Sequence, residues 1–72
     1  MKGSELVRLV RRYGRRHGIT VVFLAERGKG SHGTLYVGDR LTVIRDLKDE
    51  LKTGTLHAML KQLGLSLRDL EK

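Results

Sequence analysis

The sequence contains no cysteine and no proline among its 72 residues. The absence of cysteine excludes disulfide bonds and thiolate-rich metal sites, and it is compatible with a reducing compartment. No apolar run approaches the roughly 20 residues that a membrane-spanning helix needs, and residues 1–5 lack the apolar region of a signal peptide. We therefore expect a cytoplasmic protein with no membrane partner.

Acidic side chains are scarce, with 8 Asp and Glu against 15 Lys and Arg, which leaves a formal net charge of +7. Such an excess of cations favours association with polyanions through counterion release and long-range steering. Nucleic acid is therefore the first class of partner that the composition indicates, and an acidic protein is the second.

The chain offers no obvious point of division, because it has no internal repeat, no low-complexity tract and no linker. We expect residues 1–72 to form a single domain. A domain of this length buries only about 60% of the surface that its unfolded chain exposes, so its core is expected to be thin.

Apolar residues at helical spacing predict two main helices. The first carries the series Leu6, Leu9, Val10 and Tyr13. We expect Ser4 to be its N-cap and Gly14 to lie near its end. The second carries the series Leu56, Met59, Leu60 and Leu63. Gly64 is expected to end it in a left-handed conformation, and Ser66 with Asp69 resembles a capping box for one last short helix.

Three segments between these helices have the composition of β-strands. They are residues 19–25, 32–37 and 40–44. The last two are separated only by Gly38-Asp39, a loop suited to a tight hairpin because glycine accepts positive φ. The order α-β-β-β-α predicts an α+β fold, in which two helices pack on one face of a three-stranded antiparallel sheet and a short C-terminal helix follows.

Alternation along the second strand indicates which side chains reach the uncovered face of this sheet. If Leu35 and Val37 point at the helices, then His32, Thr34 and Tyr36 point the opposite way. The uncovered face would then carry an imidazole, a hydroxyl and an aromatic ring.

The same reasoning, applied to the third strand, predicts that Leu41 and Val43 are buried and that Arg40 and Thr42 point outward. The guanidinium of Arg40 would join His32 and Tyr36 there. Such a surface is suited to binding a ribose-phosphate chain.

The most informative motif is Gly30-Ser31-His32, which follows Gly28-Lys29. Glycine neighbours leave the side chain little shielded, and imidazole is the side chain that most readily both takes and gives protons near neutral pH. RNA supplies its own nucleophile, the 2′-hydroxyl, so cleavage needs a base, an acid and charge stabilisation at the phosphate, but no metal. His32 is the candidate acid or base. Lys29 and the amides of Gly28, Gly30 and Ser31 are candidates for an anion-binding nest.

Other residues have an ordinary interpretation beside the functional one. His32 can be an exposed strand histidine without a task, and Ser31 can bond only to the turn backbone. Tyr36 can stack on an unpaired base or simply cover the sheet. A stripe of cations favours contact with RNA or a protein partner over mere solvation. The stripe consists of Arg8, Arg11, Arg12, Arg15 and Arg16.

The two other histidines carry weaker signals. His17 is predicted to lie in a loop after the first helix, and His57 on the solvated side of the second. Histidines and carboxylates show no spacing typical of metal ligands, so neither a metal nor another cofactor is expected.

Several stretches together resemble one known family, the HicA toxins of type II toxin-antitoxin pairs. They are residues 2–6 (KGSEL), 30–32 (GSH), 42–43 (TV), 50–56 (ELKTGTL) and 60–66 (LKQLGLS). The order and distances of these stretches make the combined resemblance more specific than the tripeptide alone.

The resemblance implies a fold like that of double-stranded-RNA-binding domains. It also implies a stress-response toxin that cleaves mRNA independently of the ribosome, with His32 as its catalytic residue and a cognate HicB-like antitoxin as its inhibitor. The sequence departs from the family at Ile44 and Asp46, where many members have proline and a second histidine. Any second proton-transfer group would have to be Asp46 or a cation.

Two functional hypotheses of different classes follow. The first is a metal-independent endoribonuclease, and the second is a non-catalytic RNA-binding module that uses the same basic surface. A third, a purely protein-binding adaptor, predicts no salt-sensitive affinity for RNA.

Overall fold

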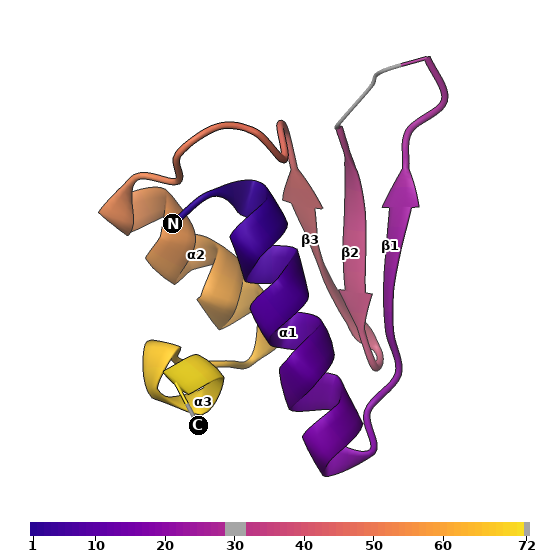
Figure 1. Cartoon of the computed structure of the whole chain (residues 1–72), viewed down its shortest axis with the longest axis vertical. Helices are drawn as coiled ribbons and strands as arrows, with labels where there is room; N and C mark the ends of the chain where they lie inside the picture. The colour runs from indigo at the N-terminus through magenta and orange to yellow at the C-terminus, as the bar shows by residue number, and fades with distance from the viewer. Residues whose placement is uncertain (29–31, 72) are drawn as a thin grey trace.

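The structure is a computed structural model that describes residues 1–28 and 32–71. Its elements are α1 (Gly3–His17), β1 (Val21–Ala25), β2 (Gly33–Val37), β3 (Arg40–Ile44), α2 (Thr53–Leu63) and α3 (Leu67–Glu71) (Figure 1). The strands form one antiparallel sheet in the order β1-β2-β3. The predicted α+β class and element order are confirmed.

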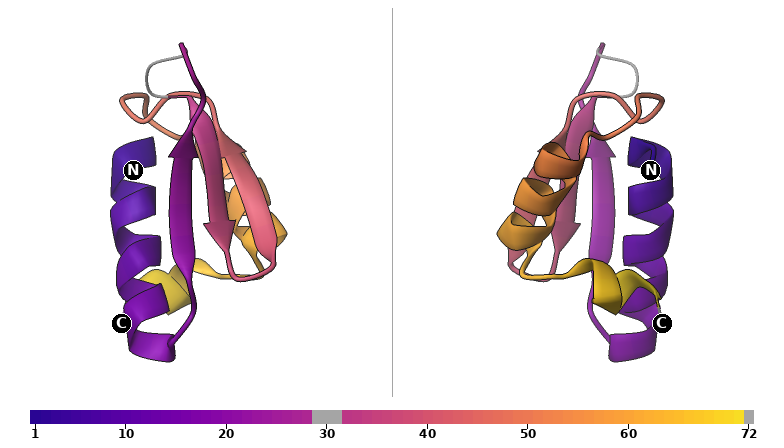
Figure 2. Two further views of the ribbon diagram at one scale, coloured as in Figure 1. Left: turned by 90° about the vertical axis from the view of Figure 1, so that its right-hand side faces the viewer. Right: turned by 90° about the vertical axis from the view of Figure 1, so that its left-hand side faces the viewer.

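The helices lie on one side of the sheet and leave its other face uncovered (Figure 2). Helix α1 packs on β1 and β2, α2 packs beside β3, and α3 packs against α1. The core between these layers consists of Leu6, Val7, Val10, Leu35, Val37, Ile44, Leu56, Met59, Leu60, Leu63 and Leu70. The apolar series predicted for α2 is therefore buried as a whole.

Helix α1 begins differently from the prediction. Lys2, not Ser4, is its N-cap, and no side chain caps it. Instead, the amides of Gly3 and Ser4 donate to the carbonyls of Asp49 (3.2 Å) and Leu47 (2.9 Å). The segment before α2 thus satisfies two of the free N–H groups that a helix start presents.

The predicted end of α1 near Gly14 is also wrong, because the helix continues to His17 and ends at Gly18 in the left-handed region (φ 67°). Gly14 lies inside the helix, where β1 approaches it closely. A Cβ at this position would stand 2.5 Å from Val21 Cγ2 and 2.6 Å from the carbonyl oxygen of Ile19. The first glycine therefore permits close packing, and the second ends the helix.

The end of α2 agrees with the sequence. Gly64 adopts φ 72°, and the Leu65 amide donates to the carbonyl of Leu60 at 2.9 Å, as in a Schellman motif. The capping box that begins α3 is also present, because the Ser66 amide donates to the Asp69 carboxylate at 2.9 Å.

The strands are slightly shorter than predicted. β1 begins at Val21 instead of residue 19, and β2 begins at Gly33, one residue after His32. The hairpin loop is Gly38-Asp39, with positive φ at Gly38 (61°) only, as in a type II′ turn with glycine at the first central position.

The predicted faces of β3 are wrong. Thr42 is almost fully buried, and its hydroxyl lies 2.5 Å from Gln62 Oε1 on α2, whereas Leu41 and Val43 are about half exposed. The register explains the difference. Val37 pairs with Arg40 across the two-residue loop, so both point to the same side of the sheet, and inward Val37 forces Arg40, Thr42 and Ile44 inward.

Candidate functional site

His32 lies at the end of the sheet, directly before β2, and faces a carboxylate from the end of β1. Its Nδ1 is 3.3 Å from Glu26 Oε2, and the His32 and Glu26 side chains are 33% and 52% exposed. The Glu26 amide donates to the His32 carbonyl at 2.7 Å. This bond extends the β1–β2 ladder by one pair and holds the two side chains opposite each other.

Gly33 explains why the ladder can close so tightly beside His32. A Cβ on Gly33 would meet the Leu24 carbonyl oxygen at 2.4 Å and Phe23 Cζ at 2.6 Å. The Phe23 ring therefore occupies the space that a side chain at position 33 would need. The glycine after the histidine serves packing, in addition to leaving the imidazole unshielded.

The pairing with Glu26 defines what the imidazole can do. A carboxylate beside Nδ1 favours the neutral tautomer that is protonated there, which leaves Nε2 free to accept a proton. A contact this exposed contributes little to stability. The contact with Glu26 instead orients the His32 ring and determines that Nε2 is the nitrogen available to a substrate.

Glu26 was missed by reasoning from the sequence, although a signal existed. Once the first two strands are paired antiparallel with Ala25 opposite Gly33, Glu26 comes opposite His32. The carboxylate expected to assist His32 was instead Asp46, which follows the third strand.

Asp46, the expected substitute for a second histidine, is not the carboxylate that contacts His32. Its Oδ1 accepts the Lys48 amide at 2.9 Å in the turn after β3. The carboxylate that the structure brings to His32 is that of Glu26.

Three of the predicted site residues, Lys29, Gly30 and Ser31, lie outside the described residues. The residue before them, Gly28, adopts a left-handed φ of 76°. The proposed anion-binding nest therefore stays a prediction.

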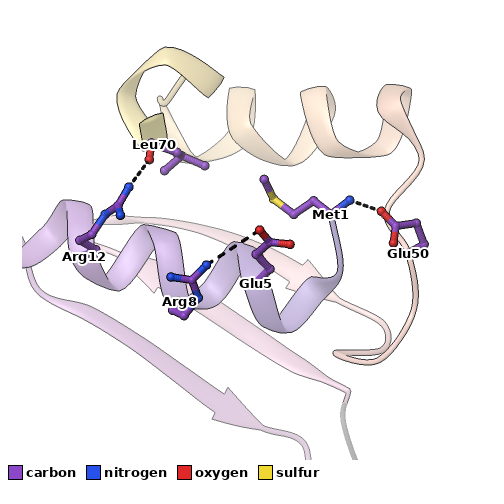
Figure 3. A network of polar contacts seen from close by, with 6 residues as sticks. All are labelled: Met1, Glu5, Arg8, Arg12, Glu50 and Leu70. Carbon is purple, nitrogen blue, oxygen red and sulfur yellow. Dashed lines mark hydrogen bonds and ion pairs between the residues drawn. The ribbon is translucent and has the colours of Figure 1, made fainter. Parts of the chain in front are cut away.

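The arginine stripe on α1 divides into groups with different contacts (Figure 3). The guanidinium of Arg12 donates to the Leu70 carbonyl at 2.7 Å and joins α1 to α3. Arg8 forms an exposed ion pair with Glu5 at 3.9 Å. Arg12 thus joins two helices, a structural role that the spacing of the stripe did not predict.

Arg11 and Arg15 lie toward the free edge of β1. With Ile19 and residues 21–23 they line a hollow of about 370 Å³ between α1 and β1, and both are exposed. These two are the cations of the stripe best placed beside the sheet.

The uncovered face of the sheet, here called the open face, carries Val22, Leu24, Thr34, Tyr36, Leu41 and Val43. The outward positions predicted for Thr34 and Tyr36 are confirmed. The predicted guanidinium is not there, because Arg40 lies on the helix side, against Gly64 at the C-terminus of α2. Four aliphatic side chains make the middle of this face apolar instead of cationic.

The other histidines are apart from this site. His17 is in the last turn of α1 instead of a loop, and its ring stacks on Tyr13 with centroids 4.3 Å apart. His57 is exposed on α2, as predicted. Within residues 1–28 and 32–71, no cluster of three or more His, Asp or Glu side chains has the arrangement of a metal site.

Comparison with protein-family models, with curated proteins and with solved structures gives no match for this chain. Across the described residues, none of the helices has the length and apolar character required to traverse a bilayer.

Proposed function

We propose that this chain is a metal-independent endoribonuclease and a cytoplasmic toxin of the HicA kind, with a fold like that of double-stranded-RNA-binding domains. The observation that carries the proposal is the exposed imidazole of His32, whose Nδ1 lies 3.3 Å from the Glu26 carboxylate, in a chain of net charge +7. The first feature supports proton transfer, and the second supports binding to a polyanion.

In this proposal His32 takes part in transesterification of the RNA backbone. The 2′-hydroxyl loses its proton to a base, its oxygen attacks the adjacent phosphorus, and the 5′-oxygen leaves with a proton from an acid. The products are a 2′,3′-cyclic phosphate and a 5′-hydroxyl. With Glu26 beside Nδ1, the nitrogen that exchanges a proton with RNA is Nε2.

The substrate path runs along the β1 side of the molecule. Arg11 and Arg15 line the hollow between α1 and β1, and β1 leads from there to Glu26 and His32. The exposed Arg27 follows directly in the connection to β2. Cations along this line would hold successive phosphates, whereas the aliphatic open face offers them nothing.

The test is cleavage of a long transcript by the purified protein in the presence of a metal chelator. We expect fragments that end in 2′,3′-cyclic phosphate, and we expect His32→Ala to lower the rate at least 100-fold with RNA affinity retained. His57→Ala is the matched control, because it removes an exposed imidazole from α2 and should leave the rate unchanged.

The alternative is the non-catalytic RNA-binding module. This alternative is supported if both the unmodified protein and His32→Ala bind RNA and neither protein cleaves it. Cleavage that disappears with the chelator would instead contradict metal independence.

An inhibitory protein partner, expected to be a HicB-like antitoxin, belongs to the same proposal. The apolar open face adjoins the His32 end of the sheet, and Arg11 and Arg15 flank the β1 side. We expect an apolar partner surface with a carboxylate rim to cover both. Amide protection mapped in the complex tests this, and unchanged exchange at Gly33–Val37 would contradict it.

A further inference from the structure

Strand β3 is at the edge of the sheet, and the hydrogen-bond pattern shows which of its backbone groups are left over. The His32 carbonyl and the Gly38 amide both bond to the chain of β1. Bonding alternates along an antiparallel strand, so even-numbered residues of β2 bond to β1 and odd-numbered ones to β3. The partners of the odd-numbered residues are Arg40, Thr42 and Ile44.

It follows that the N–H and C=O groups of Leu41 and Val43 point away from the sheet. Among the described residues, neither of the two takes part in a backbone hydrogen bond with a loop, turn or cap. Their side chains are about half exposed on the open face. Edge strands are normally guarded by lysine, proline or a bulge, and the sequence Leu41-Thr42-Val43 has none of these.

A groove of about 850 Å³ runs beside this edge. One wall is β3, and α2 supplies Thr55, Ala58 and Met59 from the helix side. Gln62 of α2 also lines it, and the small side chains of Thr55 and Ala58 leave room for a chain in extended conformation. A fourth strand placed in this groove would lie on β3 and above α2.

One end of the groove carries charged residues of both signs. Arg45 directly follows β3 and continues the alternation of Leu41 and Val43 on the open face, and Lys52 lines the same end. Three acidic residues, Asp46, Asp49 and Glu50, line the same groove. Glu50 forms an ion pair with the Met1 amino group, and Asp46 accepts the Lys48 amide and keeps its charge. Arg45 is the charged lining residue in line with Leu41 and Val43, so its guanidinium is the charge that a strand paired with β3 would meet on the open face.

We propose that the β3 edge binds an extended segment of another protein, which adds to the sheet as an antiparallel fourth strand. The residue of this segment opposite Arg45 is acidic, and the residues opposite Val43 and Leu41 are apolar. Because the segment runs antiparallel to β3, its sequence reads acidic-x-apolar-x-apolar. The residues between them are small and face Thr55 and Ala58. Main-chain bonds to Leu41 and Val43 give affinity, and the alternate side chains give specificity.

A second copy of this chain is a poorer occupant. An antiparallel pair of β3 strands is related by a twofold axis perpendicular to the sheet, so both α2 helices would lie on the same side. Each would need the groove that the other already lines with Thr55 and Ala58. An isolated extended segment meets no such conflict.

The experiment is a titration of the isotope-labelled full chain with the capped peptide Ser-Glu-Thr-Val-Thr-Val-Ser, followed by amide NMR. We expect saturable shifts and slowed exchange at the Leu41 and Val43 amides. Methylation of the two valine nitrogens of the peptide removes the donors to β3 and should weaken binding at least tenfold. Replacement of its glutamate by lysine should weaken binding to the unmodified chain and strengthen it to Arg45→Glu.

On the protein side, Val43→Pro removes an outward N–H without removing a bond to β2, and Val43→Thr is the control that keeps it. If Val43→Pro fails to fold, the methylated peptide gives the same information.

The proposal is overturned by shifts that map to α1 and β1, by equal binding of the methylated peptide, or by no shift at 1 mM peptide. Concentration-dependent changes at Leu41 and Val43 without peptide would also overturn it, in favour of self-association. None of these outcomes depends on ribonuclease activity.

Discussion

At the scale of single residues, the neighbours of His32 decide what it can do. Glu26 stands beside Nδ1, and the Glu26 amide bonds to the His32 carbonyl. The two residues lie directly beyond the paired ends of β1 and β2, and this backbone bond holds them opposite each other. In a histidine placed in this way, Nδ1 contacts the protein and Nε2 is available to the substrate.

We expect Glu26→Gln to lower RNA cleavage about tenfold with RNA affinity within twofold, because the amide lacks the charge that favours the Nδ1-protonated ring. Nitrogen chemical shifts of the His32 ring should show a larger fraction protonated at Nε2. Glu5→Gln, which removes a carboxylate from the α1 surface, is the matched control. An unchanged ring and an unchanged rate in Glu26→Gln would show that the pair has no part in the chemistry.

Gly33 gives a second prediction at this scale. Gly33→Ala places a methyl group 2.4 Å from the Leu24 carbonyl oxygen and should lower the free energy of unfolding by about 2–3 kcal/mol, as overpacking does. Gly54→Ala in α2 meets no atom within 4 Å and should be neutral or stabilising by up to about 1 kcal/mol. Urea unfolding of both variants measures the difference, and equal stabilities would refute the packing argument.

At the scale of elements, the β2–β3 hairpin shows which sequence signal is stronger when two conflict. Hydrophobicity favoured Leu41 and Val43 as the buried residues of β3. The two-residue loop required Val37 and Arg40 to share a side, and this requirement decided the outcome. A register shift of one residue would break every pair of the ladder, whereas exposing two aliphatic side chains costs far less.

The faces of β3 can be checked with one substitution made at two adjacent positions. Thr42→Lys forces an ammonium group into the core beside Gln62 and should lower the free energy of unfolding by about 3 kcal/mol or more. Leu41→Lys changes a half-exposed position and should cost at most about 1 kcal/mol. Thermal unfolding followed by circular dichroism distinguishes them, and the opposite order would restore the original assignment of faces.

At the scale of the whole molecule, charge and apolar surface are separated. The α1–β1 side presents Arg11 and Arg15, while the open face presents aliphatic side chains and the β3 edge presents unpaired backbone. A small domain with 5039 Å² of accessible surface thus has distinct regions for a polyanion and for proteins. Under the proposed function, RNA and an inhibitor would meet at His32.

The charge arrangement predicts a specific salt dependence for RNA binding. Replacing Arg11 and Arg15 together by glutamine should reduce the slope of log affinity against log salt by about 1.4–1.8, since each phosphate contact contributes about 0.7–0.9. Lys48→Gln with Arg68→Gln lowers the net charge equally at exposed positions elsewhere and should change the slope much less. Equal changes would mean that only net charge matters, without a defined path along β1.

The sequence by itself determined the order of the elements, the apolar face of α2, the glycine that ends it and the hairpin loop, because these depend on short-range periodicity and on backbone preferences. The inward position of Thr42 follows from that loop, although its hydrophobicity pattern indicated the opposite. The tertiary structure decided what depends on contact between distant segments: the task of Arg12 at α3, the close approach at Gly14 and the carboxylate of Glu26 beside His32. Those positions are set by strand register and by contact between distant segments, which residue spacing along the chain does not encode.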